Sequence, residues 1–168
     1  YDYLLEQVDI EAEYCSSDSL NHAWNIVYIH NTPYHVDVTW DDPTLDMSGR
    51  VLHKNFLRST TGIIATGHDG TDFKSTPVDT TYDNYYWQNS QTAFQLIDNE
   101  TYYFNTNSEE LCKLNDTISG ESTILKTVND RWTTSGGFYG SSYTKLLSDN
   151  YYLYYNTKDT VYRYNPKT

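Results

Sequence analysis

His22 and Asp37 are the two residues of this chain whose types and spacing best fit acid–base chemistry. They lie 15 residues apart in a stretch that reads HAWNIVYIHNTPYHVDVTWDD from position 22 to 42. An imidazole takes and returns a proton near neutral pH, and a carboxylate bonded to one ring nitrogen fixes which nitrogen carries that proton. The pair therefore predicts a general base with its orienting acid. The alternative is a half-buried His and Asp that only complete a sheet.

Two strands joined by a tight turn are expected to position this pair. Residues 23–29 and 34–40 both alternate between apolar and polar types, and His30-Asn31 supplies the turn. In this register Asp37 lies opposite Trp24 and diagonal to His22, at roughly 7–8 Å between backbones. The other face of the hairpin is expected to face the core through Ala23, Val27, Ile29, Tyr34, Val36, Val38 and Trp40. His22 and Asp37 then project together from the opposite face.

The segments HAWN (22–25) and VDVTWDD (36–42) closely resemble the strands that hold the catalytic His and Asp in the transglutaminase-like superfamily. The segments LHKNFL (52–57) and GHDGTDF (67–73) are similar to sequence that follows these strands in bacterial members. The resemblance implies that His22 is the general base and acid of a Cys–His–Asp centre and that Asp37 fixes its tautomer.

The nucleophile that the resemblance requires is a cysteine at the start of a helix. Residues 1–10 look like the last turns of that helix, so the cysteine is expected about two helical turns before Tyr1. Cys15 is a poor substitute, because acidic neighbours raise the pKa of a thiol and no basic residue or helix N-terminus opposes them. We expect Cys15 to be a structural thiol and this chain alone to be inactive in the family reaction.

The resemblance implies an α+β fold class. Residues 1–83 are expected to form the C-terminal part of a transglutaminase-like domain, and residues 84–168 a Tyr-rich β-repeat region. The first part would pack an N-terminal helix remnant on a papain-like antiparallel sheet made of strands 10–15, 23–29 and 34–40.

An internal repeat organises the second part. Residues 99–115 and 150–165 follow one pattern, in which Asn105 and Asn156 are equivalent and 51 residues apart. Each copy predicts a hairpin around an Asn-Thr turn, as in a propeller blade or a small surface β domain. Its aromatic rows could stack on sugars or pack across strands, and they comprise Tyr102, Phe104, Tyr152, Tyr154, Tyr162 and Tyr164.

The charge of the chain limits its partners. The 168 residues carry a net charge of −12, and the first 49 contain no Lys or Arg. Such a surface repels nucleic acid and anionic membranes, since binding phosphate needs cationic groups. No apolar run approaches the length of a membrane span. Few thiols, few lysines and many Tyr, Asn, Thr and Ser residues favour an extracellular or bacterial cell-surface location.

Two clusters of residues are candidate metal sites. His68, Asp69 and Asp72 form one, and Asp41, Asp42 and Asp46 form the other. Neither matches a calcium-loop pattern, so turn and cap chemistry is the favoured interpretation, and no metal or cofactor is expected. His35 shares the face of Asp37 and is a candidate supporting residue.

Two functions remain open from the sequence. The first is peptide or isopeptide hydrolysis or acyl transfer on a protein or peptidoglycan-peptide substrate, with His22 and Asp37 in the catalytic roles. The second is a catalytically inactive binding or scaffold module that contacts a cell wall, glycan or protein through its Tyr-rich repeats. The identity of the residue upstream of Tyr1 separates them.

Overall fold

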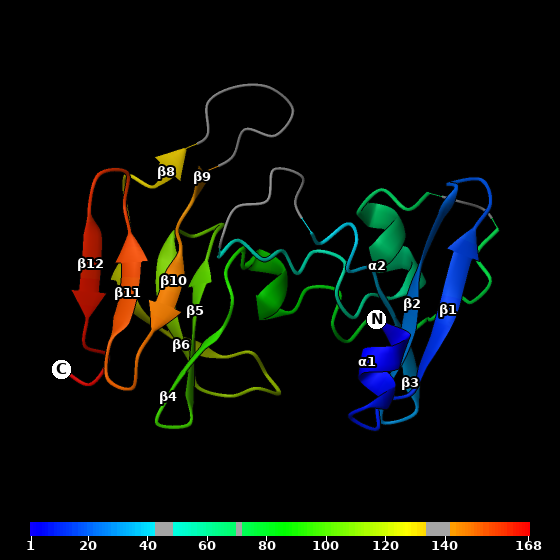
Figure 1. Cartoon of the computed structure of the whole chain (residues 1–168), viewed down its shortest axis with the longest axis horizontal. Coiled ribbons are helices and arrows are strands. Elements are labelled where there is room, and N and C mark those ends of the chain that lie inside the picture. Colours follow the sequence, from blue (N-terminus) through cyan, green and yellow to red (C-terminus); the bar gives the residue numbers. More distant parts are fainter. Residues whose placement is uncertain (43–48, 70–71, 134–141) are drawn as a thin grey trace. The chain divides into compact units, whose positions relative to one another are not determined.

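The structure is a computed structural model that describes residues 1–42, 49–69, 72–133 and 142–168. These residues fall into two compact units, whose strands and helices are labelled in Figure 1. The first unit comprises 1–42 and 54–88, and the second comprises 89–168 with 43–53, as far as each is described. The units thus change at 88/89, where the sequence suggested 83/84.

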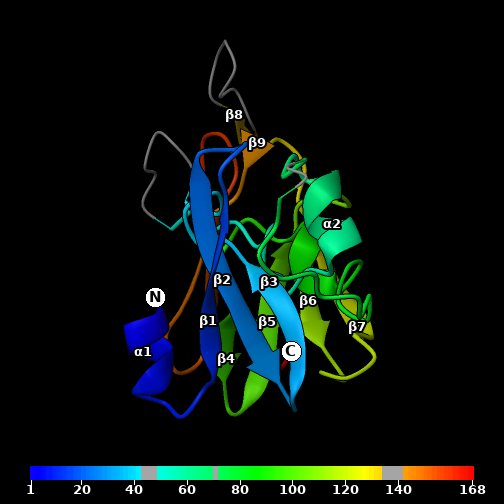
Figure 2. The same cartoon turned by 90° about the vertical axis from the view of Figure 1, so that its right-hand side faces the viewer.

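The first unit is built on an antiparallel sheet in the order β1-β2-β3, formed by Ala12–Ser17, His22–Ile29 and Thr32–Val36. The two-residue turn between β2 and β3 has positive φ at His30 (49°) and Asn31 (64°), and Ile29 pairs with Thr32. The expected hairpin and its register are therefore confirmed. α1 (Asp2–Glu6) lies beside β1 in Figure 2, and α2 (Thr60–Ala65) follows later in the chain.

β3 ends at Val36, so the strand predicted over 34–40 is too long. The carboxylate of Asp37 accepts hydrogen bonds from the backbone amides of Thr39 (2.9 Å) and Trp40 (3.1 Å) and closes a turn directly after the strand. Such local side-chain bonds compete with strand pairing. Val38 and Trp40 consequently leave the predicted core face and are 42% and 39% exposed.

Both faces of this sheet are buried, whereas the pattern predicted one core face. One face packs the cluster Leu5, Val27, Tyr34, Val36 and Leu57. The other face packs Cys15, Trp24 and Ile26, with Leu20 and Phe73 against them. Because Phe73 comes from the chain after α2, that segment covers the face on which His22 and Asp37 lie.

The second unit consists mainly of two antiparallel sheets over one hydrophobic core. The first runs β4-β5-β6-β7, formed by Gln95–Ile97, Glu100–Asn105, Glu110–Leu114 and Ser122–Thr127. The second runs β10-β11-β12, formed by Leu146–Ser148, Leu153–Asn156 and Val161–Tyr164. The remaining described elements are the 3-10 helix η1 (Tyr86–Asn89) and the pair β8 (Trp132–Thr133) and β9 (Ser142–Tyr143).

The two expected hairpins of the repeat are present and share one register. Asn105 pairs with Glu110 in β5–β6, and Asn156 pairs with Val161 in β11–β12. The repeat also extends further than the sequence showed, because β4 and β10 are again 51 residues apart and hold the same place in their sheets. Its aromatic rows do not form one open surface, since Tyr102 and Phe104 belong to the buried core.

The expected α+β class is wrong, because the chain is essentially all-β. The described residues form twelve strands in four antiparallel sheets, beside α-helices of only five and six residues. α1 buries Leu5 alone, while Tyr3, Leu4 and Val8 are exposed. With one buried side chain it cannot form the helical layer that a papain-like sheet requires. No helix in the described ranges is long and apolar enough to cross a membrane.

Candidate active site

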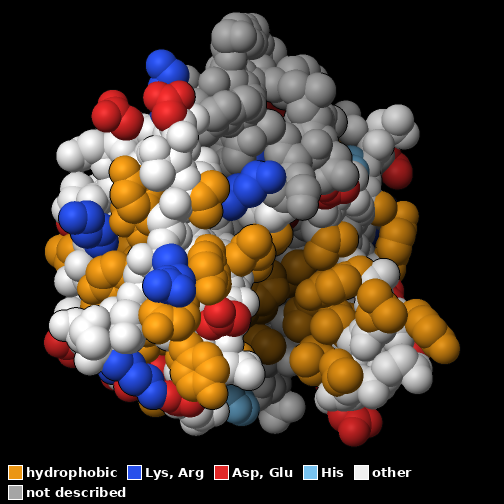
Figure 3. All heavy atoms as spheres, turned by 60° about the vertical axis from the view of Figure 1, so that its left-hand side comes forward, with side chains coloured by type: hydrophobic (Ala, Val, Ile, Leu, Met, Phe, Trp, Pro, Cys, Tyr) orange, Lys and Arg blue, Asp and Glu red, His pale blue; other side chains and the backbone are white. Residues whose placement is uncertain are grey.

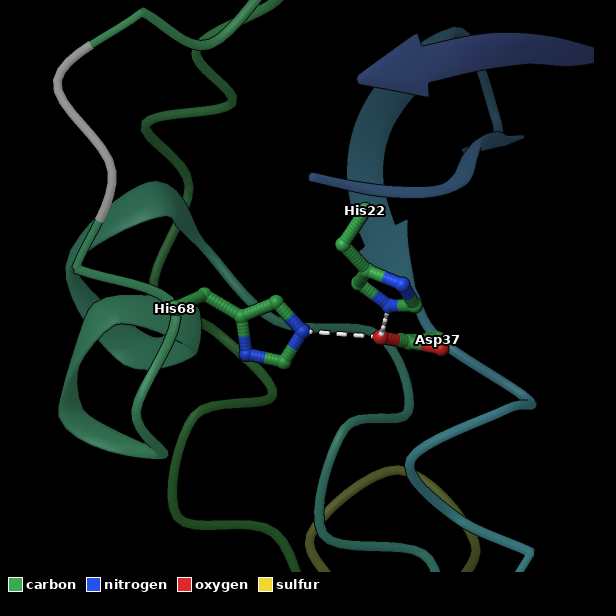
Figure 4. A group of neighbouring side chains, drawn as sticks. All are labelled: His22, Asp37 and His68. Atoms are coloured by element: carbon green, nitrogen blue, oxygen red, sulfur yellow. Dashed lines mark hydrogen bonds and ion pairs between the residues drawn. The ribbon is translucent and has the colours of Figure 1, made fainter. Parts of the chain in front are cut away.

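The fold brings His22 and Asp37 into contact. His22 opens β2 and Asp37 follows β3, so both side chains lie at the same end of neighbouring antiparallel strands. His22 Nε2 is 2.5 Å from Asp37 Oδ2. Figure 4 shows the imidazole directed at this carboxylate oxygen. Since an ionised carboxylate only accepts hydrogen bonds, His22 donates its Nε2 proton, and in the neutral ring Nδ1 then has the lone pair. Within the described part of the chain, this Nδ1 has no hydrogen-bond partner.

Four hydrogen bonds fix the carboxylate of Asp37, which is 1% exposed. Oδ2 accepts from Nε2 of His22 and of His68, and Oδ1 accepts from the amides of Thr39 and Trp40. Burial raises the pKa of Asp37, but the hydrogen bonds from His68, His22 and the Trp40 backbone outweigh it, so the net shift is downward. The carboxylate therefore stays ionised at neutral pH in one orientation.

His68 joins the site through a contact with Asp37 that the sequence did not predict. It is fully buried, and its Nε2 lies 2.8 Å from Asp37 Oδ2. Figure 4 shows both imidazoles directed at the same carboxylate oxygen. Ser59 caps α2 by accepting from the Gly62 amide, and the helix ends at Ala65, three residues before His68. In the sequence, His68 stands in a segment (67–73) that is similar to family sequence and beside Asp69 and Asp72 as a possible metal ligand, and neither feature specifies a contact with Asp37.

Two indole rings enclose His22. The imidazole stacks between Trp24 and Trp40, with ring centroids 5.6 and 5.3 Å away, and Trp40 also contacts His68 at 3.9 Å. A Cβ on Gly67 would lie 3.4 Å from Trp40, so glycine permits this close approach. Trp40 was predicted to face the core beside Val36; the turn after Asp37 places it over the site instead. The two rings therefore restrict the orientation of the His22 imidazole.

His35 supports the site without touching Asp37 through its side chain. Its Nδ1 accepts from Trp24 Nε1 (2.8 Å), and its Nε2 bonds Thr60 Oγ1 (3.0 Å). Burial, with a smaller contribution from the charge of His68, lowers the pKa of His35 to about 4. His35 is therefore neutral at physiological pH and holds the indole that stacks on His22.

The acidic residues weighed as metal ligands have separate roles. Asp72 accepts hydrogen bonds from Ser17 (2.6 Å) and the Asp18 amide (2.7 Å), which fastens its loop to the β1–β2 turn. Asp41 accepts from Asn55, and burial raises the pKa of Asp41 to about 6. Asp46 lies outside the described residues. In the described chain, the three groups close enough to share a metal ion are His22, Asp37 and His68.

Both thiols of the chain are buried. Cys15 pairs across the sheet with Trp24 and is 0% exposed, and burial raises its pKa. Burial also raises the pKa of Cys112, in the second unit, to about 11. A cavity of about 250 Å³ in the first unit lies between the start of the chain and β2, lined by Tyr1, Asp2, Tyr3, Tyr14, Ala23, Trp24 and Asn25. It therefore adjoins the residues that directly follow His22.

No family model, no curated protein and no solved structure matches this chain.

Proposed function

We propose that this chain carries the base and orienting acid of a transglutaminase-like Cys–His–Asp centre, which hydrolyses or transfers amide bonds. The observation that carries the proposal is the 2.5 Å contact of His22 Nε2 with a fixed, ionised Asp37, which leaves Nδ1 with a lone pair. The motif residues from 22 to 42 support the family. The proposed substrate is a protein or peptidoglycan peptide at a bacterial cell surface.

The proposed reaction needs a thiol from sequence N-terminal to Tyr1, because Cys15 and Cys112 are buried with raised pKa values. His22 Nδ1 takes the thiol proton, and the thiolate attacks the amide carbon. The imidazolium then gives this proton to the departing amine as the C–N bond breaks, leaving a thioester. Water or a second amine, deprotonated by His22, attacks the thioester and releases the thiol. Asp37 holds the imidazole and stabilises its cationic form throughout.

The tautomer of His22 tests this arrangement in the chain itself. Long-range ¹H–¹⁵N spectra of metal-free protein at pH 7.5 are expected to show His22 protonated at Nε2 and not at Nδ1. In Asp37→Asn, the amides of Thr39 and Trp40 retain the carbonyl oxygen, so the new NH₂ group faces His22 and His68. The imidazole of His22 must then accept at Nε2 and carry its proton on Nδ1. A His22 that is already protonated at Nδ1 in the unaltered chain contradicts the proposal.

Thiol reactivity tests the full centre. We consider a version of the protein that is extended upstream of Tyr1. A Cys in the upstream segment is expected to react rapidly with an alkylating reagent well below pH 8, and to lose this reactivity in His22→Ala. His30→Asn, on the same hairpin but exposed, is the matched control. An upstream thiol that is unreactive, or indifferent to His22→Ala, would sink the enzymatic proposal.

A second candidate function, a surface-binding module, is favoured by aromatic exposure in the second unit. Tyr151 is 69% exposed and Tyr162 43% exposed, and Figure 3 shows hydrophobic side chains among Lys and Arg on one face. Exposed tyrosines stack on sugar rings. Cosedimentation with purified cell walls that falls in a Tyr151→Ala/Tyr162→Ala variant, and not in Val78→Ala, is the expected result. Binding that both variants retain would contradict this function.

A further inference from the structure

Three metal-ligand atoms converge at the candidate active site. His22 Nε2, His68 Nε2 and Asp37 Oδ2 all lie within 4.8 Å of one another, and they come from three separate segments of the first unit (Figure 4). Both nitrogens bond the same oxygen, at 2.5 and 2.8 Å. Two imidazoles and one carboxylate are a donor set that suits Zn²⁺ and related divalent ions, whereas Ca²⁺ and Mg²⁺ prefer oxygen ligands.

The remaining polar atoms of these ligands have outer partners, as in metal centres. Asp37 Oδ1 is held by two backbone amides, which leaves Oδ2 for the centre. Thr66 Oγ1 gives its only proton to the Ile63 carbonyl (2.7 Å), so it can only accept from His68 Nδ1 (3.3 Å). A metal-bound histidine needs its proton on the other nitrogen, usually on an outer acceptor. Thr66 provides that acceptor for His68.

His68 is the more deeply buried of the two histidine ligands. Both of its nitrogens face acceptors, Thr66 Oγ1 and Asp37 Oδ2, although the residue is fully buried. His22 is the ligand on the solvent side, with a side chain 16% exposed. A tetrahedral ion needs its donors about 3.3 Å apart, so His22 is the ring that must shift.

We propose that His22, Asp37 and His68 bind one Zn²⁺ ion, or a similar divalent transition-metal ion, with water in the fourth position. On binding, each Nε2 gives up its proton to solvent, and His22 takes one proton from solvent at Nδ1, so both bound rings are neutral and protonated at Nδ1. The consequence for catalysis rests on the proposed function above: His22 bound through Nε2 carries its proton on Nδ1 and has no lone pair for a thiol. The metal-bound state is therefore an inhibited state, and removing the metal restores the base.

Zn²⁺ affinity measured on this chain by competition with a chromophoric chelator tests the site. The unaltered protein and the exposed-histidine control His30→Asn are expected to bind one ion equally. His68→Asn and His22→Asn should each weaken binding by more than the roughly 10–100-fold that outer partners contribute. Equal affinity in His22→Asn and the control, or no saturable binding by the unaltered chain, would overturn the proposal.

A second measurement tests the site even if the buried variant His68→Asn does not fold. Zn²⁺ added to the unaltered, ¹⁵N-labelled chain should move the Nε2 resonances of His22 and His68 and place the proton of His22 on Nδ1. Unchanged Nε2 resonances at saturating Zn²⁺ contradict the site whatever the variants do. The proposed function is tested by a different measurement, the tautomer of His22 in metal-free protein. Either proposal can therefore fail without the other.

Discussion

The histidines of the first unit show that partners, and not residue type, determine what an imidazole does. His35 is a buried acceptor for Trp24, and burial lowers its pKa to about 4. His22 and His68 instead donate to one ionised carboxylate. Asp37 can serve both because its second oxygen is held independently by backbone amides.

The hydrogen bond from Trp24 Nε1 to His35 Nδ1 gives a prediction for the stability of the fold. Trp24→Phe keeps an aromatic ring beside His22 but leaves the buried Nδ1 of His35 without its donor, which costs about 1–3 kcal/mol. Trp40→Phe is the matched control, since it also shrinks a ring that stacks on His22. Urea unfolding should show the larger loss for Trp24→Phe. Equal losses would mean that the indole N–H does not stabilise the fold.

The two thiols give a prediction for pH dependence. Burial raises the pKa of Cys112 to about 11, so the thiolate fraction and the alkylation rate should rise until about that pH. Cys15 is also buried with a raised pKa and should be slow at pH 8. The single-thiol variants Cys15→Ser and Cys112→Ser show which thiol has which alkylation rate. Unfolding in urea should make both thiols react rapidly. Rapid alkylation of native Cys15 at pH 7 would contradict its structural role.

At the scale of elements, a hairpin and a short helix build the site. The tight turn between β2 and β3 sets the register that aligns His22 with Asp37. α2 then directs the chain so that His68 reaches the same carboxylate. A long helix packed on the sheet is not needed for this arrangement, because loops cover both sheet faces.

The cap of α2 should control the placement of His68. Ser59→Ala removes the acceptor for the Gly62 amide and a donor to Asp83, and a lost cap costs about 1–2 kcal/mol. Its measured effects should be lower stability and shifted His68 resonances. Thr61→Ala, at an exposed position of the same helix, should change neither. Unshifted His68 resonances in Ser59→Ala would show that α2 does not position this residue.

β5 gives a prediction for alkaline stability. Burial, with the hydrogen bond to Glu100, raises the pKa of Tyr102 to about 12 from its ordinary 10.0. The fold thus favours the neutral phenol, so its stabilising contribution is full below pH 10 and is lost as the pH rises through 12. Tyr102→Phe should reduce the loss of stability between pH 9 and pH 12, measured by urea unfolding. Tyr151→Phe, at an exposed position, should not.

For the whole molecule, the division into two cores decides which changes reach the site. The first unit contains His22, Asp37 and His68 together with the described residues that bond to them or stack on them, while the repeat region has its own core. The acidic excess is also concentrated in residues 1–83, with 14 acids and 4 bases.

Phe104→Ala tests this division. Phe104 is 0% exposed in the core of the second unit, and such a truncation costs about 3–5 kcal/mol. Unfolding monitored by tyrosine fluorescence should show that loss, while the nitrogen resonances of His22 stay in place. Ile26→Ala, in the core of the first unit, is the comparison and should move them. Shifts of His22 in folded Phe104→Ala would contradict separate cores.

The sequence by itself determined what depends on near neighbours. Alternation and a two-residue turn gave the β2–β3 register, which places Asp37 beside His22, and a 51-residue repeat gave two hairpins of equal register. Period-2 patterns and turn residues act over a few positions, so they can be found without a fold.

Only the tertiary structure decided the rest of the site and the fold class. His68 bonds a carboxylate 31 residues away, and no periodicity specifies such a contact. Asp37 ends its own strand by bonding two amides, which moves Trp40 from the expected core to the imidazole. The remnant helix expected over residues 1–10 is α1, and it contributes only Leu5 to the core. These outcomes depend on contacts between residues that are distant in the sequence, and such contacts form only when the chain packs.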